Sequence, residues 1–290
     1  MSGAVVAVGG GHGLAATLRA LVGTADHTTG IVSTADDGGS TGRLRELWDV
    51  PGVGDVRKCL GALAVPGSAW DRLLARRFDA GELKGHAVGN LLLLSLADEL
   101  GGLQAACDEM ARIAGIDARR ARVVPATERV VTLHGRAGTG EEVEGQVAVA
   151  ATTGIDEVWV EPRSAGASPD ALAALTEADQ IVLGPGSLYT SILAAIVVGD
   201  VRTAIEASAA QVVLVANLRS DQPETAGHDI AAHVRAVHRH GVSVDVVLAH
   251  PGALPVGDVG VALVEEPVAA VGGRVHDPGL LGAALRSLRS

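Results

Sequence analysis

The run Ser33-Thr-Ala-Asp-Asp-Gly-Gly-Ser-Thr-Gly-Arg-Leu-Arg45 joins two carboxylates to a loop of small residues that two arginines close. It continues a predicted strand over 29–33. Upstream, Ala4-Val-Val-Ala-Val8 predicts a buried strand that enters the turn Gly9-Gly-Gly-His-Gly13 and a helix over 14–22. If the two strands pair in parallel, both loops lie at the edge where open α/β sheets bind ligands. Glycines let backbone approach a phosphate, and free N–H groups at a helix start favour an anion, so the pattern predicts a phosphorylated ligand.

A second unit of strand, glycine turn and helix begins at Gln180. Its turn reads Gly184-Pro-Gly-Ser187, with Ser187 placed as N-cap and the hydroxyls of Tyr189 and Thr190 in the first turn. Hydroxyls and free N–H groups together predict a second anion-binding end. A merely tight β–α turn is the alternative. The next predicted strand, 211–216, ends at Asn217.

The segment between these units carries the remaining candidate residues. Asp55 is placed as N-cap of a helix over 56–64, and Arg57 follows in the first turn, where the helix dipole disfavours a cation. Asn90 opens another helix and either caps it or reads a ligand base or sugar. Asp36 or Asp37 together with Asp55 would suit Mg²⁺, which prefers hard carboxylate oxygens near phosphates.

The hydrophobic period shifts towards two over 121–161, which predicts a β-rich insertion of short strands. On both sides of it, apolar strands alternate with amphipathic helices. We therefore expect one α/β domain over 1–290, built as a Rossmann-like three-layer α/β/α sandwich, with the insertion inside it.

Composition excludes several classes of function. The net charge of −11 and the 2% content of aromatic residues argue against nucleic-acid binding. Cys59 and Cys107 are too few for a disulfide framework and too far apart for a zinc site. His233, His238 and His240 are expected on a solvated helix face. No apolar run approaches the ~20 residues of a membrane helix, and no signal peptide is evident, so we expect a cytoplasmic protein without membrane insertion.

Several motifs together resemble the YvcK family, also called the gluconeogenesis factor family, of the CofD-like superfamily. They stand in the family's order and spacing across nearly the whole chain: Gly9-Gly-Gly-His-Gly-Leu14, Ala35-Asp-Asp-Gly-Gly-Ser-Thr-Gly-Arg-Leu-Arg45, Gly54-Asp-Val-Arg57, Gly85-His-Ala-Val-Gly-Asn-Leu91, Val131-Thr-Leu-His134, Leu183-Gly-Pro-Gly-Ser-Leu-Tyr-Thr-Ser-Ile192 and His276-Asp-Pro278.

The resemblance implies a cytoplasmic bacterial regulator that binds UDP-sugars, notably UDP-N-acetylglucosamine and UDP-glucose. It also implies a role in carbon flow into cell-wall precursors and in cell shape, with glucosamine-6-phosphate synthase as a partner. The superfamily's other branch is 2-phospho-L-lactate transferase, which uses Mg²⁺ and a nucleotide diphosphate donor. By position, Asp37 and Asp55 correspond to that branch's metal ligands.

The chain departs from the family pattern where members are thought to hold the nucleotide sugar. His12 replaces a threonine, Val275 replaces the arginine before His276, and no tyrosine follows Tyr189. An NAD(P)-binding protein without redox chemistry is a further alternative, because Gly11-His-Gly13 with Ala16 matches a GxGxxA spacing. We also expect a homo-oligomer.

The residues that we expect to line the ligand site are Gly9, Gly10, Gly11, His12, Gly13, Asp36, Asp37, Gly38, Gly39, Ser40, Thr41, Arg43, Arg57, Asn90, Gly184, Pro185, Gly186, Ser187, Tyr189, Thr190 and Asn217.

Overall fold

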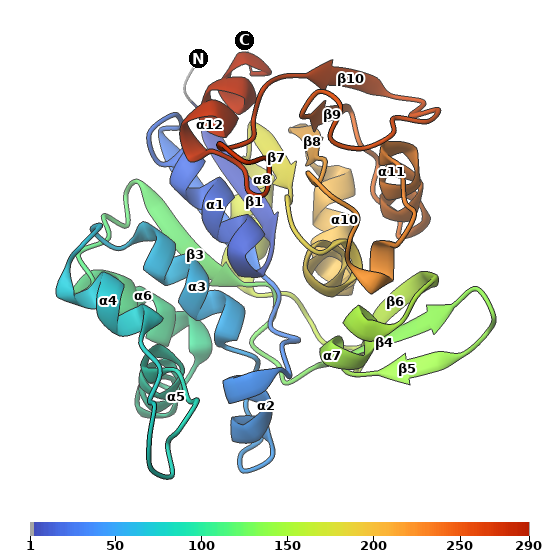
Figure 1. Cartoon of the computed structure of the whole chain (residues 1–290). Helices are drawn as coiled ribbons and strands as arrows, with labels where there is room; N and C mark the ends of the chain where they lie inside the picture. Colours follow the sequence, from blue (N-terminus) through green and yellow to red (C-terminus); the bar gives the residue numbers. More distant parts are fainter. Residues whose placement is uncertain (1–2, 290) are drawn as a thin grey trace.

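A seven-stranded sheet forms the centre of the computed structural model, which describes residues 3–289 (Figure 1). All of its strand pairs are parallel, in the order β10-β9-β8-β7-β1-β2-β3. Its inner strands are almost wholly buried, as expected where helices cover both faces of a sheet. The strands are β1 Ala4–Gly9, β2 His27–Val32, β3 Ala121–Pro125, β7 Gln180–Leu183, β8 Gln211–Val215, β9 Val246–Ala249 and β10 Ala262–Glu265.

Helices cover both faces of this sheet, so the prediction of a three-layer α/β/α sandwich is confirmed. Each face has its own apolar core; Val5 and Ala7 point into one, and Val6 and Val8 into the other. On the first face lie α1 Gly11–Leu21, α3 Gly54–Leu63, α4 Ala69–Ala75, α5 Val88–Leu100, α6 Leu103–Ile113 and α12 Pro278–Ser287. On the second lie α8 Pro169–Glu177, the π-helix Leu188–Leu193, α9 Ala194–Ile196, α10 Gly199–Ala207 and α11 Ile230–Arg239.

A small antiparallel sheet lies beside the carboxyl edge of the main sheet, at the lower right of Figure 1. Its strands are β4 Thr132–Ala137, β5 Glu142–Glu144 and β6 Ile155–Glu161, in the order β5-β4-β6. The predicted insertion is therefore narrower than 121–161. Residues 121–125 are instead the edge strand β3, because they pair with β2 from Thr28 to Val32.

Two segments near the site differ in type from the prediction. Residues Gln146–Ala151, expected to be extended, form the short helix α7, whose first amides are held by a side chain from the β2 loop. Val53, not Asp55, is the N-cap residue of α3, and Asp55 lies inside its first turn. The loop after β2 also ends in the short helix α2 Gly39–Arg45.

The order in which the chain adds strands reverses between β1 and β7, two parallel neighbours at the centre of the sheet. From β1 the order runs through β2 to β3, and from β7 it runs the opposite way through β8 to β10. Ligands of open α/β sheets bind in the crevice at such a switch point. The loops that follow β1 and β7 are therefore the first place to look for a site.

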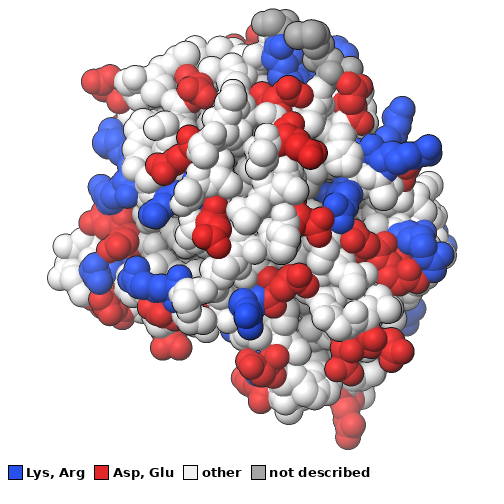
Figure 2. Space-filling view, turned by 180° about the vertical axis from the view of Figure 1, so that it is seen from behind, with Lys and Arg blue, Asp and Glu red and all other residues white. Residues whose placement is uncertain are grey.

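No single helix within residues 3–289 is long and apolar enough to span a membrane. One pair, Leu188–Ile196 with Gly199–Ala207, reaches that length and apolarity only together and is bent by 76°. On the face shown in Figure 2, Lys and Arg side chains are interspersed with Asp and Glu.

Candidate ligand-binding site

The two glycine turns lie side by side at the switch point. The strand register sets Val8 opposite Leu183, so both turns begin at the same level. A β-carbon on Gly13 would run into the carbonyl oxygen of Pro185, so only glycine permits this approach. Asn217, at the end of β8, holds the second turn: its Oδ1 accepts from the Gly186 N–H at 3.0 Å, and its Nδ2 donates to the Gly186 carbonyl at 2.9 Å.

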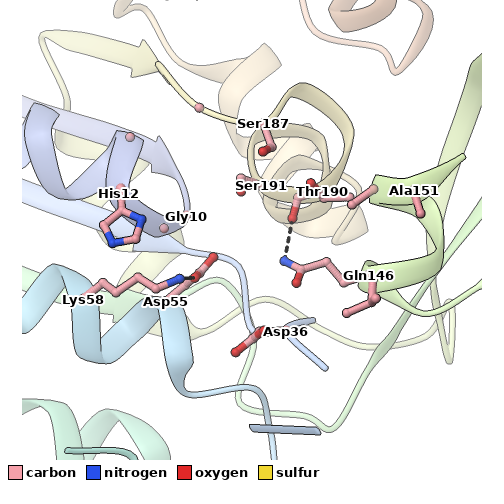
Figure 3. A pocket seen from close by; sticks show the side chains of 15 residues that line it. Gly10, His12, Asp36, Asp55, Lys58, Gln146, Ala151, Ser187, Thr190 and Ser191 are labelled. Atoms are coloured by element: carbon pink, nitrogen blue, oxygen red, sulfur yellow. Dashed lines mark hydrogen bonds and ion pairs between the residues drawn. The ribbon is translucent and has the colours of Figure 1, made fainter. Parts of the chain in front are cut away.

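A cavity of about 550 Å³ opens between these turns, α3 and α7 (Figure 3). His12, Lys58 and Asp55 lie on one wall, and Gln146 faces Thr190 across from them. Its lining combines backbone from glycines, hydroxyls and a few charges, which is the composition expected for a polar ligand. The lining residues are Gly10, Gly11, His12, Gly13, Asp36, Asp55, Lys58, Gln146, Val147, Ala150, Ala151, Gly186, Ser187, Thr190 and Ser191.

The charged groups of this cavity compensate one another only in part. Lys58 Nζ lies 2.8 Å from Asp55 Oδ1, one turn earlier on α3. Burial raises the pKa of Asp55, Lys58 lowers it, and the Asp36 carboxylate raises it further. Partial burial and the Lys58 ammonium lower the pKa of His12, so its imidazole is neutral at pH 7. Lys58 is therefore the cation that this cavity offers to an anionic ligand.

Asp37 does not reach the cavity. Its carboxylate accepts the N–H groups of Gln146 at 2.8 Å and Val147 at 3.0 Å, and so fixes the first turn of α7. This places Gln146 so that its Nε2 donates to the Thr190 carbonyl at 3.0 Å (Figure 3). Gln146 was not among the predicted site residues, because it belongs to no motif and residues 142–151 were expected to form a strand.

A second lobe of about 300 Å³ continues the cavity from His12 and Ser187 towards Asn217. Arg219 pairs with Asp221 at 2.8 Å on its far side, and Arg274 lines it as well. Burial lowers the pKa of His276 to about 4, which leaves a neutral imidazole in this wall. The two lobes together form an elongated cleft across the switch point.

Besides Asp37, four predicted ligand contacts with large polar side chains lie outside these two lobes: Arg43, Arg57, Asn90 and Tyr189. Arg57 and Asn90 bond to each other, Nε to Oδ1 at 2.9 Å, behind the cavity wall. Arg43 donates to the Lys84 carbonyl at 3.0 Å. Tyr189 is buried against the rings of two histidines, 6.2 Å from each ring centre. None of them lines the 550 Å³ cavity, since each already serves packing between helices or loops.

The other predicted residues support the loops. Gly9 and Gly184 are buried at the two bends, and Pro185 lines the second lobe. Ser40 lies 3.2 Å from the ring of His86, and Thr41 accepts from the Asn90 amide at 3.3 Å. Gly38 and Gly39 line a separate groove beside Val147.

Of the two carboxylate pairings that the sequence offered for Mg²⁺, the residues fit Asp36 with Asp55 and not Asp37 with Asp55, the pairing that the resemblance implied. Asp36 replaces Asp37 as the neighbour of Asp55, because the Asp37 oxygens are held by α7. Within residues 3–289, no three His, Cys, Asp or Glu side chains gather as a metal cluster. Two carboxylates with the phosphates of a ligand are nonetheless a common Mg²⁺ arrangement, so Asp36 and Asp55 could hold the ion once a nucleotide is bound.

A buried glutamate lies beneath the π-helix that carries Thr190. Glu224, in the 3-10 turn Pro223–Thr225, is 1% exposed and faces the first-turn amides of residues 188–190. Burial raises its pKa from 4.5 to about 7, and the Thr190 hydroxyl with those amides opposes the rise. π-helices are rare and often occur at functional sites, and this one places Thr190 and Ser191 in the wall of the ligand cavity.

Replacing Glu224 with glutamine should make the protein more stable at pH 8 than the unchanged protein, and about equal at pH 5. The folded pKa lies above the unfolded one, so the folded state keeps a proton between pH 4.5 and 7 that the unfolded state has lost. Stability from this group therefore falls as pH rises through that window, by on the order of 3 kcal/mol. Urea unfolding at pH 5, 6, 7 and 8 measures it; an unchanged difference between the two proteins across pH would contradict the assignment.

Comparisons with known proteins agree with this fold. The family model "2-phospho-L-lactate transferase CofD" matches residues 5–265. A crystal structure of a UPF0052 family member from Bacillus halodurans superposes with a TM-score of 0.92 at 31% identity, covering 98% of this chain and 99% of that one. The chain is thus an α/β protein of the class that the CofD and UPF0052 families define.

The chain belongs to the CofD-like family and, within it, to the gluconeogenesis factors. A relative from Halalkalibacterium halodurans named "Gluconeogenesis factor" is 38% identical over 85% of this chain and 77% of its own length. A relative from Deinococcus radiodurans is 43% identical over 84% of this chain, but the match spans 52% of that protein. One from Mycobacterium tuberculosis is 36% identical over 98% of this chain and 90% of its own length.

Proposed function

We propose that this protein is a cytoplasmic regulator that binds a UDP-sugar, with UDP-N-acetylglucosamine or UDP-glucose as ligand. The observation that carries the proposal is the close approach of the two glycine turns across the switch point. Backbone N–H groups at the start of α1 are free to bind a diphosphate, and Lys58 adds a positive charge beside them. The sugar and the base then extend along the cleft, with one end in the lobe beside Asn217.

The net charge of the cleft does not favour an anionic ligand, because the carboxylates of Asp36 and Asp55 repel a phosphate. The affinity therefore depends on hydrogen-bond donors that the fold holds in position. The protein would sense the concentration of the ligand through the two segments that line the cleft, the turn held by Asn217 and the π-helix held by Gln146. In this proposal the bound state controls carbon flow into cell-wall precursors and cell shape, with glucosamine-6-phosphate synthase as one receiver of the signal.

Isothermal titration and thermal unfolding with UDP-N-acetylglucosamine, UDP-glucose, NAD and GDP, each with and without Mg²⁺, test the proposal. We expect both UDP-sugars to stabilise the protein without Mg²⁺, by about 2.7 kcal/mol at a concentration of 100 times Kd. The UDP-sugars should remain intact after incubation. Stabilisation by NAD or GDP alone, with none by UDP-sugars, would refute the proposal.

A second candidate is a Mg²⁺-dependent transferase that uses a nucleotide diphosphate donor. It is favoured by the pair Asp36 and Asp55, which share one wall of the cavity, and by the transferase that gives the family model its name. It predicts that GDP binds only with Mg²⁺ and that Asp55→Asn removes this dependence. UDP-sugar binding that Mg²⁺ does not change would decide for the regulator.

A further inference from the structure

A third lobe, of about 370 Å³, borders His12 and is lined by no residue of the π-helix. It is enclosed by α1, α3, α4 and the segment 275–278. It shares His12 and Lys58 with the first cavity, so ligands in the two would be neighbours. The lining residues are His12, Ala15, Ala16, Arg19, Arg57, Lys58, Gly61, Asp71, Leu74, Ala75, Val275, His276 and Pro278.

Arg57 brings a buried positive charge to this lobe. It is 7% exposed, and its side chain lies in a slot where a β-carbon on Gly89 would touch the Arg57 stem at 2.8 Å. Its Nε and Nη1 donate to Asn90 Oδ1 and to the Leu74 carbonyl at 2.9 and 2.8 Å. Among the described residues, no carboxylate forms an ion pair with it. A buried guanidinium without an acidic partner is costly unless an anion compensates it.

Two further side chains point to the same kind of ligand. Arg19 of α1 lines the lobe, and no ion pair with a described carboxylate is present. His276 is nine-tenths buried, and its Nε2 has no hydrogen-bond partner among residues 3–289. Asp71 is the one carboxylate of the lining; its Oδ2 already accepts the Gly67 N–H at 2.9 Å, so it serves the start of α4.

We propose that this lobe binds a small phosphate monoester, held between Arg57 and Arg19. Two guanidinium groups match the oxygens of a dianionic phosphate, which they bind in a forked geometry that a lysine cannot offer. The volume suits a metabolite of a few carbon atoms. Its position next to Lys58 would let it modulate the ligand of the first cavity, which makes the cleft a site for two metabolites.

The Arg57 slot explains how such a site keeps its shape when empty. Gly89 admits the Arg57 stem close to the backbone of α5, and the two hydrogen bonds fix the plane of the guanidinium. The third nitrogen, Nη2, has no hydrogen bond within the described chain. A donor held in place before the ligand arrives loses little entropy on binding.

Titration calorimetry with glycerol 3-phosphate and inorganic phosphate, and with glycerol as the uncharged control, tests this site without any nucleotide present. We expect saturable binding of glycerol 3-phosphate, weakened about tenfold or more in Arg19→Ala. Arg19 is exposed, so this variant should fold. The matched control is Arg120→Ala, because Arg120 is an exposed arginine just before β3 that lines none of the three lobes.

Ser187→Ala separates the third lobe from the first, because Ser187 lines the first two lobes only. It should leave glycerol 3-phosphate binding unchanged. Loss of binding in Ser187→Ala but not in Arg19→Ala would place the phosphate in the first cavity and overturn the inference, as would no saturable binding. If UDP-sugars fail to bind while the Arg19 effect holds, the proposed function fails and this site stands.

Discussion

Changing Lys58 to methionine should weaken UDP-N-acetylglucosamine binding about a hundredfold, since a charge-assisted hydrogen bond contributes about 1.5–3 kcal/mol. Lys58 is the cation in the first cavity. Its ammonium group, together with the partial burial of His12, keeps the His12 imidazole neutral. Removing it also leaves the Asp55 carboxylate, which is 4% exposed, beside the diphosphate without its partner at 2.8 Å. The remaining charge on the wall then repels the ligand. Titration calorimetry at pH 7.5 measures the change.

The chain supplies a matched control for this substitution, because it contains two lysines. Lys84 is exposed on the loop before α5 and lies outside the cleft, so Lys84→Met should bind the ligand normally. Lys58→Arg keeps the charge and should retain most of the affinity. Normal binding by a folded Lys58→Met protein would show that the diphosphate lies elsewhere.

The backbone of the site could be predicted from the sequence, because glycine is conspicuous wherever chains approach closely. The turns at Gly9–Gly13 and Gly184–Ser187, and their meeting at one sheet edge, follow from strand and helix periodicity with parallel pairing. The three-layer fold follows from the same alternation. Glycines therefore indicate the positions where the backbone approaches another segment or a ligand closely.

The side chains that face the cavity could not be predicted with the same success. Asp36 and Asp37 are adjacent in sequence, so local pattern does not show which one lies beside Asp55. The choice depends on α7, which begins at residue 146 and binds the Asp37 carboxylate. Over residues 142–151 the valines Val143, Val147 and Val149 all fall on alternate positions, which favours a strand. The helix α7 depends on the Asp37 carboxylate, a contact across more than a hundred residues.

Arg57 is a second example of a side chain whose contacts local sequence does not predict. It lies in the first turn of α3, where the helix dipole disfavours a cation, and a cation at such a position indicates a ligand. The structure gives its guanidinium two protein acceptors, one on α5 and one on α4, and places it in the third lobe instead of the first cavity. Local sequence shows that a residue is out of place, but tertiary contacts decide what compensates it.

Replacing Arg57 with methionine should lower the free energy of unfolding by about 3 kcal/mol or more, the largest loss of stability expected from a single change in the cleft. Methionine fills the slot between Gly89 and Leu74, so little cavity forms. The loss comes from the Asn90 Oδ1 and the Leu74 carbonyl, two buried acceptors that are left without donors. Urea unfolding followed by circular dichroism measures it.

Two further variants show whether those acceptors are the cause. Arg120→Met, at an exposed position, should change stability by no more than about 0.5 kcal/mol. Asn90→Leu added to Arg57→Met removes one orphaned acceptor and should cost less than the sum of the two single changes, because the pair shares one hydrogen bond. Strict additivity, or a loss below about 1 kcal/mol in Arg57→Met, would mean that water replaces the guanidinium. Arg57 would then matter chiefly as the positive charge of the third lobe, and its removal should weaken glycerol 3-phosphate binding while leaving the fold as stable as before.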